Sequence, residues 1–319
     1  MALSEKQRRW LEAHPELGRR QSMKRRHNKH DYQAPCIYMI TLVTDGRRPV
    51  LGHLMPPDRD HAIPWIRHSD LGNRVSRCWH EIPDFYPQVK LLGHQLMPDH
   101  MHGIIYVKER LPRHLGHVIN GFKVACNRVV REFSMPRLWE EGYNDRILHH
   151  KGQLDAMIKY LIDNPRRLWV KRNNPEQFKI QTEVSIGDQT VTVMGNRFLL
   201  DSPNKVAVKC SRSLDESQIE HQVERFMMMA QRGAVLVSPR ISKGEKTVMD
   251  MVQAAGFPVI RLLENGFSPL RKPGGKMFDA CASGQVLLVA PWPYHSDHRT
   301  ISREQCNRLN DLATLITAM

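Results

Sequence analysis

Hydrophobic residues in the first half of the chain gather in short runs of strand length. These runs cover 36–44, 88–97 and 100–107, and each predicts a strand. Pro98 and Asp99 separate the last two runs, and a Pro-Asp pair at such a junction is typical of a tight reversal. The pattern therefore predicts that these two strands form a hairpin.

Helical periodicity appears between and after these runs. Apolar residues recur at i, i+3, i+4 and i+7 over 115–133 and again over 153–163, and a further helix is predicted over 70–82. Pro165 is expected to end the 153–163 helix, because proline cannot continue the hydrogen-bond ladder. Strands interleaved with helices in this order predict an α+β domain with helices on one face of a sheet.

The second half of the chain has a different pattern, in which four apolar segments of strand length alternate with helices that end at glycine. The expected strands are 205–210, 234–238, 257–263 and 285–291. Capping boxes are expected at Ser213/Glu216, Ser242/Glu245 and Ser302/Gln305. This alternation predicts an α/β domain with a parallel, Rossmann-like sheet.

Two domains are expected from these patterns and from the length of 319 residues. We predict a basic tail over 1–31, a first domain over 32–180, a linker over 181–200 and a second domain over 201–319.

Positive charge is concentrated in the first part of the chain. Of the formal net charge of +14, residues 1–180 carry +12 (31 Lys and Arg against 19 Asp and Glu). A basic domain beside a nearly neutral one indicates a polyanionic partner for the first. The six scattered cysteines fit reduced thiols. No apolar run of membrane-spanning length occurs, so a cytoplasmic protein without membrane contact is expected.

His100 and His102 lie two residues apart in a predicted strand. Residues i and i+2 of a strand point to the same face, so both imidazoles can reach one ion while Met101 faces the other way. Two neutral imidazoles leave open positions on a divalent cation, and a metal held so can polarise a phosphoryl oxygen. The alternative is a pair of ordinary surface or half-buried histidines.

Tyr160 and Asn164 are four residues apart on the 153–163 helix and its end, and so are neighbours on one helix face. A tyrosine can act as a covalent nucleophile where a nearby metal stabilises its phenolate. From the spacing alone, the alternatives stay open: Tyr160 packing at the rim of the core, and Asn164 as a helix C-terminal residue.

Four segments together give residues 36–170 a resemblance to the REP-associated tyrosine transposases of the HUH single-strand transposase family. The segments are LMPDHMHGIIYV, HLGHVINGFKVACNRVV, LWEEGYNDRILHH and IKYLIDNP. Their order and spacing match the family's Met-Pro-x-His-x-His strand, Trp-x-x-Gly-(Phe/Tyr) segment and Tyr-Ile-x-x-Asn-Pro helix.

The resemblance implies a role for each matching residue. His100 and His102 would be metal ligands, Asn164 a third ligand for Mg²⁺ or Mn²⁺, and Tyr160 the nucleophile that cleaves and rejoins single-stranded or hairpin DNA through a 5′-phosphotyrosine link. The implied fold is a ferredoxin-like antiparallel sheet. Asp99 replaces the usual Asn of the strand motif and adds a negative charge beside the expected metal.

Other residues are candidates for holding DNA. Trp139 and Tyr143 could stack on exposed bases, with core packing as the alternative. The arginines just beyond the tyrosine are candidate backbone contacts, or else a solvated helix end: Arg166, Arg167 and Arg172. Tyr143 is also a rival nucleophile, ranked below Tyr160 because Gly142 before it suggests a loop.

Residues 200–319 show a fainter resemblance to the Rossmann-like domain of DNA-processing proteins of the DprA/Smf type. The segment AVLVSPRISKGEKTVMDMVQAAGFPVIRLLENG carries it. Its loop 238–244 lies where a strand meets a helix N-terminus, so Ser238, Arg240 and Lys243 are candidates for a phosphate-binding loop. Pro239 replaces the first loop glycine, and a scaffold without nucleotide is the alternative.

The sequence is compatible with three functions. The first is metal-dependent DNA transposition and strand cleavage through Tyr160. The second is a domesticated DNA-binding protein whose chemistry is dispensable. The third is a nucleotide- or single-strand-binding module, formed by the C-terminal domain and targeted by the transposase-like part. The oligomeric state, monomer or homodimer, stays open.

Overall fold

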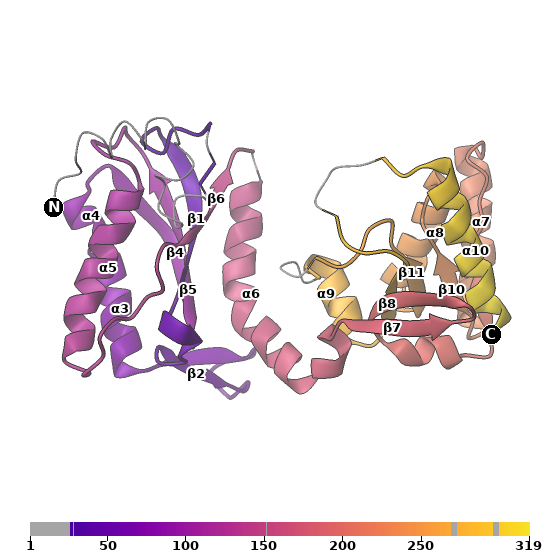
Figure 1. Cartoon of the computed structure of the whole chain (residues 1–319), viewed down its shortest axis with the longest axis horizontal. Coiled ribbons are helices and arrows are strands. Elements are labelled where there is room, and N and C mark those ends of the chain that lie inside the picture. Colours follow the sequence, from indigo (N-terminus) through magenta and orange to yellow (C-terminus); the bar gives the residue numbers. More distant parts are fainter. Residues whose placement is uncertain (1–25, 28, 151, 269–272, 296–299) are drawn as a thin grey trace, which may run out of the picture. The chain divides into compact units, whose positions relative to one another are not determined.

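The computed structural model describes residues 26–27, 29–150, 152–268, 273–295 and 300–319. The chain divides into two compact units, Met1–Trp169 and Val170–Met319 (Figure 1). Each unit has its own sheet and core and is described by itself. Residues 1–25 of the expected basic tail lie outside the described residues.

An antiparallel sheet of four strands forms the centre of the first unit. Its order is β4 (Val89–Met97), β5 (His100–Val107), β1 (Cys36–Val43) and β6 (Asn144–Leu148). The hairpin predicted around Pro98 and Asp99 is confirmed, because β4 and β5 pair antiparallel with Met97 opposite His100.

Helices cover one face of this sheet (Figure 1). They are α3 (Asp70–His80), the short α4 (Ile82–Phe85) and α5 (Gly116–Arg131). Every second residue of β1 joins them in the core, including Tyr38, Ile40 and Leu42. A small hairpin of β2 (Gly52–Met55) and β3 (Trp65–His68) completes the unit.

Helix α6 (Gln153–Asn173) lies on the opposite face of the sheet. A Cβ on Gly93 of β4 would lie 3.8 Å from Leu161 of α6, so the helix packs closely there. The prediction that the helix stops at Pro165 is wrong, since α6 continues to Asn173. Proline removes one N–H from the ladder, and in the same turn the Asn164 side chain donates a hydrogen bond to the Tyr160 carbonyl (2.8 Å).

The second unit contains a mixed sheet of six strands, in the order β7-β8-β12-β11-β10-β9. The strands are β7 (Gln181–Ile186), β8 (Gln189–Gly195), β9 (Lys205–Ala207), β10 (Val235–Ser238), β11 (Val259–Leu262) and β12 (Val286–Ala290). The last four are parallel to one another, as predicted. β8 runs antiparallel to β12, so the sheet as a whole is not parallel.

Residues 181–200, expected to be a linker, instead contain β7 and β8 and contribute to this sheet. The two strands pair antiparallel around Gly187 and Asp188. Buried side chains from β8, such as Val191 and Val193, belong to the core of the second unit.

Four longer helices accompany the sheet: α7 (Glu216–Gln231), α8 (Lys243–Ala254), α9 (Gly275–Ala282) and α10 (Arg303–Ala318). The capping boxes predicted at Ser242 and Ser302 are confirmed. The box predicted at Ser213 is wrong, because Asp215 caps α7 and Ser213 bonds to Ser211 instead. Among the described helices, none has the length and apolar character needed to span a membrane.

Candidate functional site

The alternation of β5 places His100 and His102 together on the face of the sheet toward α6. Their rings lie edge to face with centroids 4.9 Å apart. Met101 between them is 1% exposed and belongs to the core on the other face. The sequence-based prediction that the two imidazoles share one face agrees with this geometry.

Each of these histidines has a hydrogen-bond partner at Nδ1. His100 Nδ1 lies 2.7 Å from Asp99 Oδ1, and His102 Nδ1 lies 2.8 Å from Thr41 Oγ1. When Nδ1 carries the proton and donates it in this way, Nε2 of the same ring is the acceptor that can bind a metal. The Asp99 carboxylate only accepts, so its contact favours this tautomer in His100. The Thr41 hydroxyl can donate or accept, so its contact is compatible with either tautomer of His102.

The electrostatic surroundings of the two rings differ. Burial, and after it the charge of His100, lowers the pKa of His102 to about 3, so this ring is neutral near pH 7. Asp99 contacts His100 on one oxygen and Arg47 on the other (3.2 Å). The hydrogen bond from His100 is the main cause that holds the pKa of Asp99 below its usual value. The His100 ring thus contacts a carboxylate, whereas the His102 ring contacts a neutral hydroxyl.

Tyr160 of α6 faces this histidine pair. Its ring centroid lies 5.5 Å from that of His102, at an interplanar angle of 68°. The guanidinium of Arg167 lies 5.7 Å from the Tyr160 ring centroid. The fold therefore brings the predicted nucleophile next to one of the two predicted ligands.

Asn164 is the predicted third ligand and is buried at 7% exposure, one turn after Tyr160. Its side-chain nitrogen is bonded to the Tyr160 carbonyl, which leaves the amide oxygen as the atom available for a cation. In the described part of the chain, no group of three or more His, Cys, Asp or Glu side chains could hold a metal. Imidazole nitrogens and amide oxygens are donor types that a divalent cation can use, with water or substrate in the remaining positions.

The arginines expected to contact DNA occupy different environments. Arg166 pairs with Asp163 within α6. Arg167 lies over the Tyr160 ring and so belongs to the site. Arg172 is exposed and lies in the second unit.

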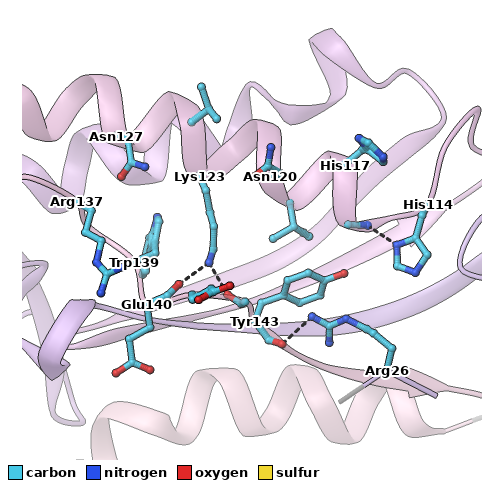
Figure 2. A pocket seen from close by; sticks show the side chains of 15 residues that line it. Arg26, His114, His117, Asn120, Lys123, Asn127, Arg137, Trp139, Glu140 and Tyr143 are labelled. Atoms are coloured by element: carbon cyan, nitrogen blue, oxygen red, sulfur yellow. Dashed lines mark hydrogen bonds between the residues drawn. The ribbon is translucent and has the colours of Figure 1, made fainter. Parts of the chain in front are cut away.

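Trp139 and Tyr143 line a separate pocket, on the α5 side of the first unit (Figure 2). Trp139 is 4% exposed and packs near Phe122, with ring centroids 6.0 Å apart, so the core-packing alternative describes it. Tyr143 is held under the guanidinium of Arg26, 3.5 Å from the ring centroid. Burial raises the pKa of Tyr143 well above its usual value, which disfavours the phenolate that a nucleophile needs.

The candidate phosphate loop of the second unit is occupied by contacts within the chain. Ser238 is fully buried, Arg240 pairs with Asp250 (2.6 Å) and Lys243 pairs with Glu216 (3.0 Å). The carboxylate of Glu245, itself 5% exposed, accepts hydrogen bonds from the amides of Ile241 (2.7 Å) and Ser242 (3.3 Å). The backbone donors that would hold a phosphate are thus used by a side chain of the protein.

Two residues of the histidine site escaped sequence analysis. Thr41 reaches His102 because β1 pairs with β5 in the register that sets these residues opposite each other. Arg47 reaches Asp99 from a short helical turn (Asp45–Arg47) in which its own φ is +53°. Neither has a motif. The strand pairing could have indicated Thr41, whereas nothing in the sequence indicates Arg47.

Comparison with known proteins gives limited likeness. No known family profile matches the chain. An uncharacterized protein of Haemophilus influenzae is 26% identical over 167 residues, which cover 46% of this chain and 88% of that protein.

Two solved structures share partial similarity, each over 44% of this chain and with a TM-score of 0.34. One is a REP-associated tyrosine transposase bound to a REP hairpin (11% identity, 72% of that chain covered). The other is DNA processing protein A from Helicobacter pylori, studied for its binding of single-stranded DNA (17% identity, 67% covered). At these values the likeness carries no functional argument, and the site has to be judged by its own geometry.

Proposed function

We propose that this protein is a metal-dependent DNA strand transferase that cleaves and rejoins single-stranded or hairpin DNA through Tyr160. The observation that carries the proposal is the ring of Tyr160 against His102, 5.5 Å between centroids, beside a second histidine on the same strand face. The motif resemblance of residues 36–170 and the basic charge of this part of the chain support a DNA substrate.

The residues around the histidine pair would bind the metal and orient its ligands. His100 and His102 would hold Mg²⁺ or Mn²⁺ through Nε2, with Asn164 contributing its amide oxygen. When bound, the cation supplies Lewis-acid stabilisation of negative charge on the phosphate. Asp99 keeps the His100 imidazole in the required tautomer, and Thr41 holds the His102 ring by a hydrogen bond that is compatible with it.

Tyr160 carries the covalent step. Its phenolic oxygen forms a bond to phosphorus, the bond from phosphorus to the 3′ oxygen breaks, and the 3′ oxygen gains a proton as the phenol loses one. The products are a 5′-phosphotyrosine link and a free 3′-OH, and the reverse reaction rejoins a strand. The guanidinium of Arg167, 5.7 Å from the Tyr160 ring centroid, would bind a phosphate oxygen of the DNA at this site.

The test is an end-labelled library of single-stranded hairpin oligonucleotides with Mg²⁺ or Mn²⁺, analysed on denaturing gels for a protein–DNA adduct. Wild type, Tyr160→Phe and His100→Ala are compared, with Tyr106→Phe as a control tyrosine of β5. An adduct that both site variants lose and the control keeps supports the proposal. DNA binding without any adduct in the wild type would contradict it and favour a DNA-binding protein without catalysis.

A further inference from the structure

A pocket of about 560 Å³ lies between α5 and the segment 137–143, away from the histidine pair (Figure 2). This volume is within the range of small-molecule and cofactor sites. One wall is the face of α5 that carries Asn120, Lys123 and Asn127, and the other includes Trp139 and Tyr143. No residue of the histidine site lines it.

The second wall is held in place by Lys123. Its ammonium group donates to the carbonyls of Glu140 (2.6 Å) and Gly142. At the end of the same segment, Arg26 donates to the Tyr143 carbonyl (2.8 Å) and forms an ion pair with Asp145. The pocket is therefore formed before a ligand enters, which lowers the ordering cost of binding.

The cations that line the pocket are already bound within the protein: Lys123 by the two carbonyls, Arg26 by Asp145 and Arg137 by Asp45. The charges left for a ligand therefore argue against a simple anion. Glu140 and Glu141 both line it, and the Glu141 carboxylate is close enough to Lys123 to raise the pKa of that lysine against the stronger effect of burial. A phosphate only accepts hydrogen bonds at its oxygens and would meet these carboxylates unfavourably. A ligand with N–H groups of its own would be bound by them.

Donors are available on the same walls. The Asn127 side-chain oxygen accepts from the Leu138 amide (3.2 Å), so its NH₂ group is the part left for a ligand. The Tyr143 hydroxyl is buried and has no hydrogen-bond partner among the described residues. An acceptor of the ligand would satisfy it. The pocket thus combines carboxylate acceptors, amide and hydroxyl donors, and aromatic walls.

We propose that this pocket binds one unpaired guanine base of the DNA that the protein acts on. A planar base fits between α5 and the segment 137–143, where the accessible parts of Trp139 and Tyr143 line the pocket. Guanine has N–H donors for a carboxylate such as Glu141 on the same edge as O6, an acceptor for an amide or hydroxyl donor. The inference rests on the proposed function only for the nature of the polymer, because the pocket and Tyr160 occupy opposite faces of the sheet.

The experiment measures binding by fluorescence anisotropy in EDTA, so that covalent chemistry at Tyr160 does not contribute. The probes are a labelled 12-mer oligothymidine and the same oligomer with one central dG, dA or dC. The full-length protein is compared with Glu141→Ala and with the control Glu109→Ala, an exposed glutamate outside the pocket.

The dG oligomer is expected to bind about tenfold more tightly than oligothymidine, the value of one good base-edge contact. Glu141→Ala should lose this preference and keep the affinity for oligothymidine, whereas Glu109→Ala should keep both. Equal affinity for all four oligomers, equal gains from dA and dG, or a preference that survives Glu141→Ala would overturn the proposal. Adduct formation is scored separately, so failure here leaves the role of Tyr160 to its own test.

Discussion

The histidine face of the first unit and the loop 238–244 of the second unit both carry a functional signature in the sequence, and the fold treats them in opposite ways. At the histidine face, the protein bonds to Nδ1 of each ring and keeps Nε2 available. At the loop, the carboxylate of Glu245 takes the amides that an anion would need. A motif therefore indicates a site only where the fold leaves its chemical groups unsatisfied.

The largest expected effect comes from breaking the histidine face. His102→Ala should reduce adduct formation about a thousandfold, because several kcal/mol of charge stabilisation by the cation are lost. Adduct yield is measured on gels and Mn²⁺ binding by electron paramagnetic resonance. His53→Ala, at an exposed histidine of β2, is the control. An adduct at the wild-type rate in His102→Ala would show that the histidine pair holds no essential metal.

The next largest effect is expected when the Glu245 carboxylate is removed from the loop 238–244 of the second unit. Glu245→Ala should lower the free energy of unfolding of the second unit by about 2–3 kcal/mol, because buried amides lose their acceptor. The same change should let inorganic phosphate raise the thermal midpoint of the variant, as a ligand of the folded state does. Wild type and Glu304→Ala, an exposed first-turn glutamate of α10, should not respond. A phosphate response of equal size in wild type would contradict the filled-loop description.

A smaller effect on metal affinity is expected from a change at Asp99, beside His100. Asp99→Asn keeps a hydrogen-bond acceptor for His100 but removes the negative charge, so Mn²⁺ affinity should fall about 10- to 100-fold. Isothermal titration calorimetry measures this, with Asp84→Asn on α4 as the matched control. Unchanged affinity would mean that the carboxylate orients the ring without strengthening the metal site.

The smallest effect concerns pH. The pKa of His102 is lowered to about 3 in the folded protein, from about 6.5, so the unfolded chain binds more protons between these values. Stability due to this group is present above about pH 6.5 and is lost as pH falls toward 3. The slope for one such histidine approaches about 1.4 kcal/mol per pH unit. In EDTA, His102→Gln should lose less stability than wild type between pH 7 and 5. Equal losses would show that the ring is charged when folded.

Much of the first unit could be predicted, because strand period and helix period fix which residues share a face. His100, His102 and Met101 follow directly from the period of two. The pairing of Thr41 with His102 could not be predicted, since it depends on the register between strands 61 residues apart. The continuation of α6 through Pro165 could not be predicted either, because a proline removes one ladder hydrogen bond without always ending the helix.

In the second unit, the four parallel strands were correctly predicted from apolar runs, and residues 181–200 were not. The segment VSIGDQTVTV carries alternating β-branched residues around a Gly-Asp pair, a hairpin signal that its polar composition concealed. The use of Glu245 as an internal anion could have been suspected, because the capping box that predicts the start of α8 already directs this carboxylate toward the loop.

The two faces of β5 should constrain the evolution of this protein in different ways. Met101 fills the core, and a side chain on Gly103 would collide with the Trp79 ring at 2.2 Å. His100 and His102 point the other way and carry the chemistry. Substitutions at Met101 and Gly103 should therefore be filtered by folding and those at His100 and His102 by activity. A lineage that abandoned cleavage would drift first at His100 and His102, with period two, while Met101 and Gly103 stayed.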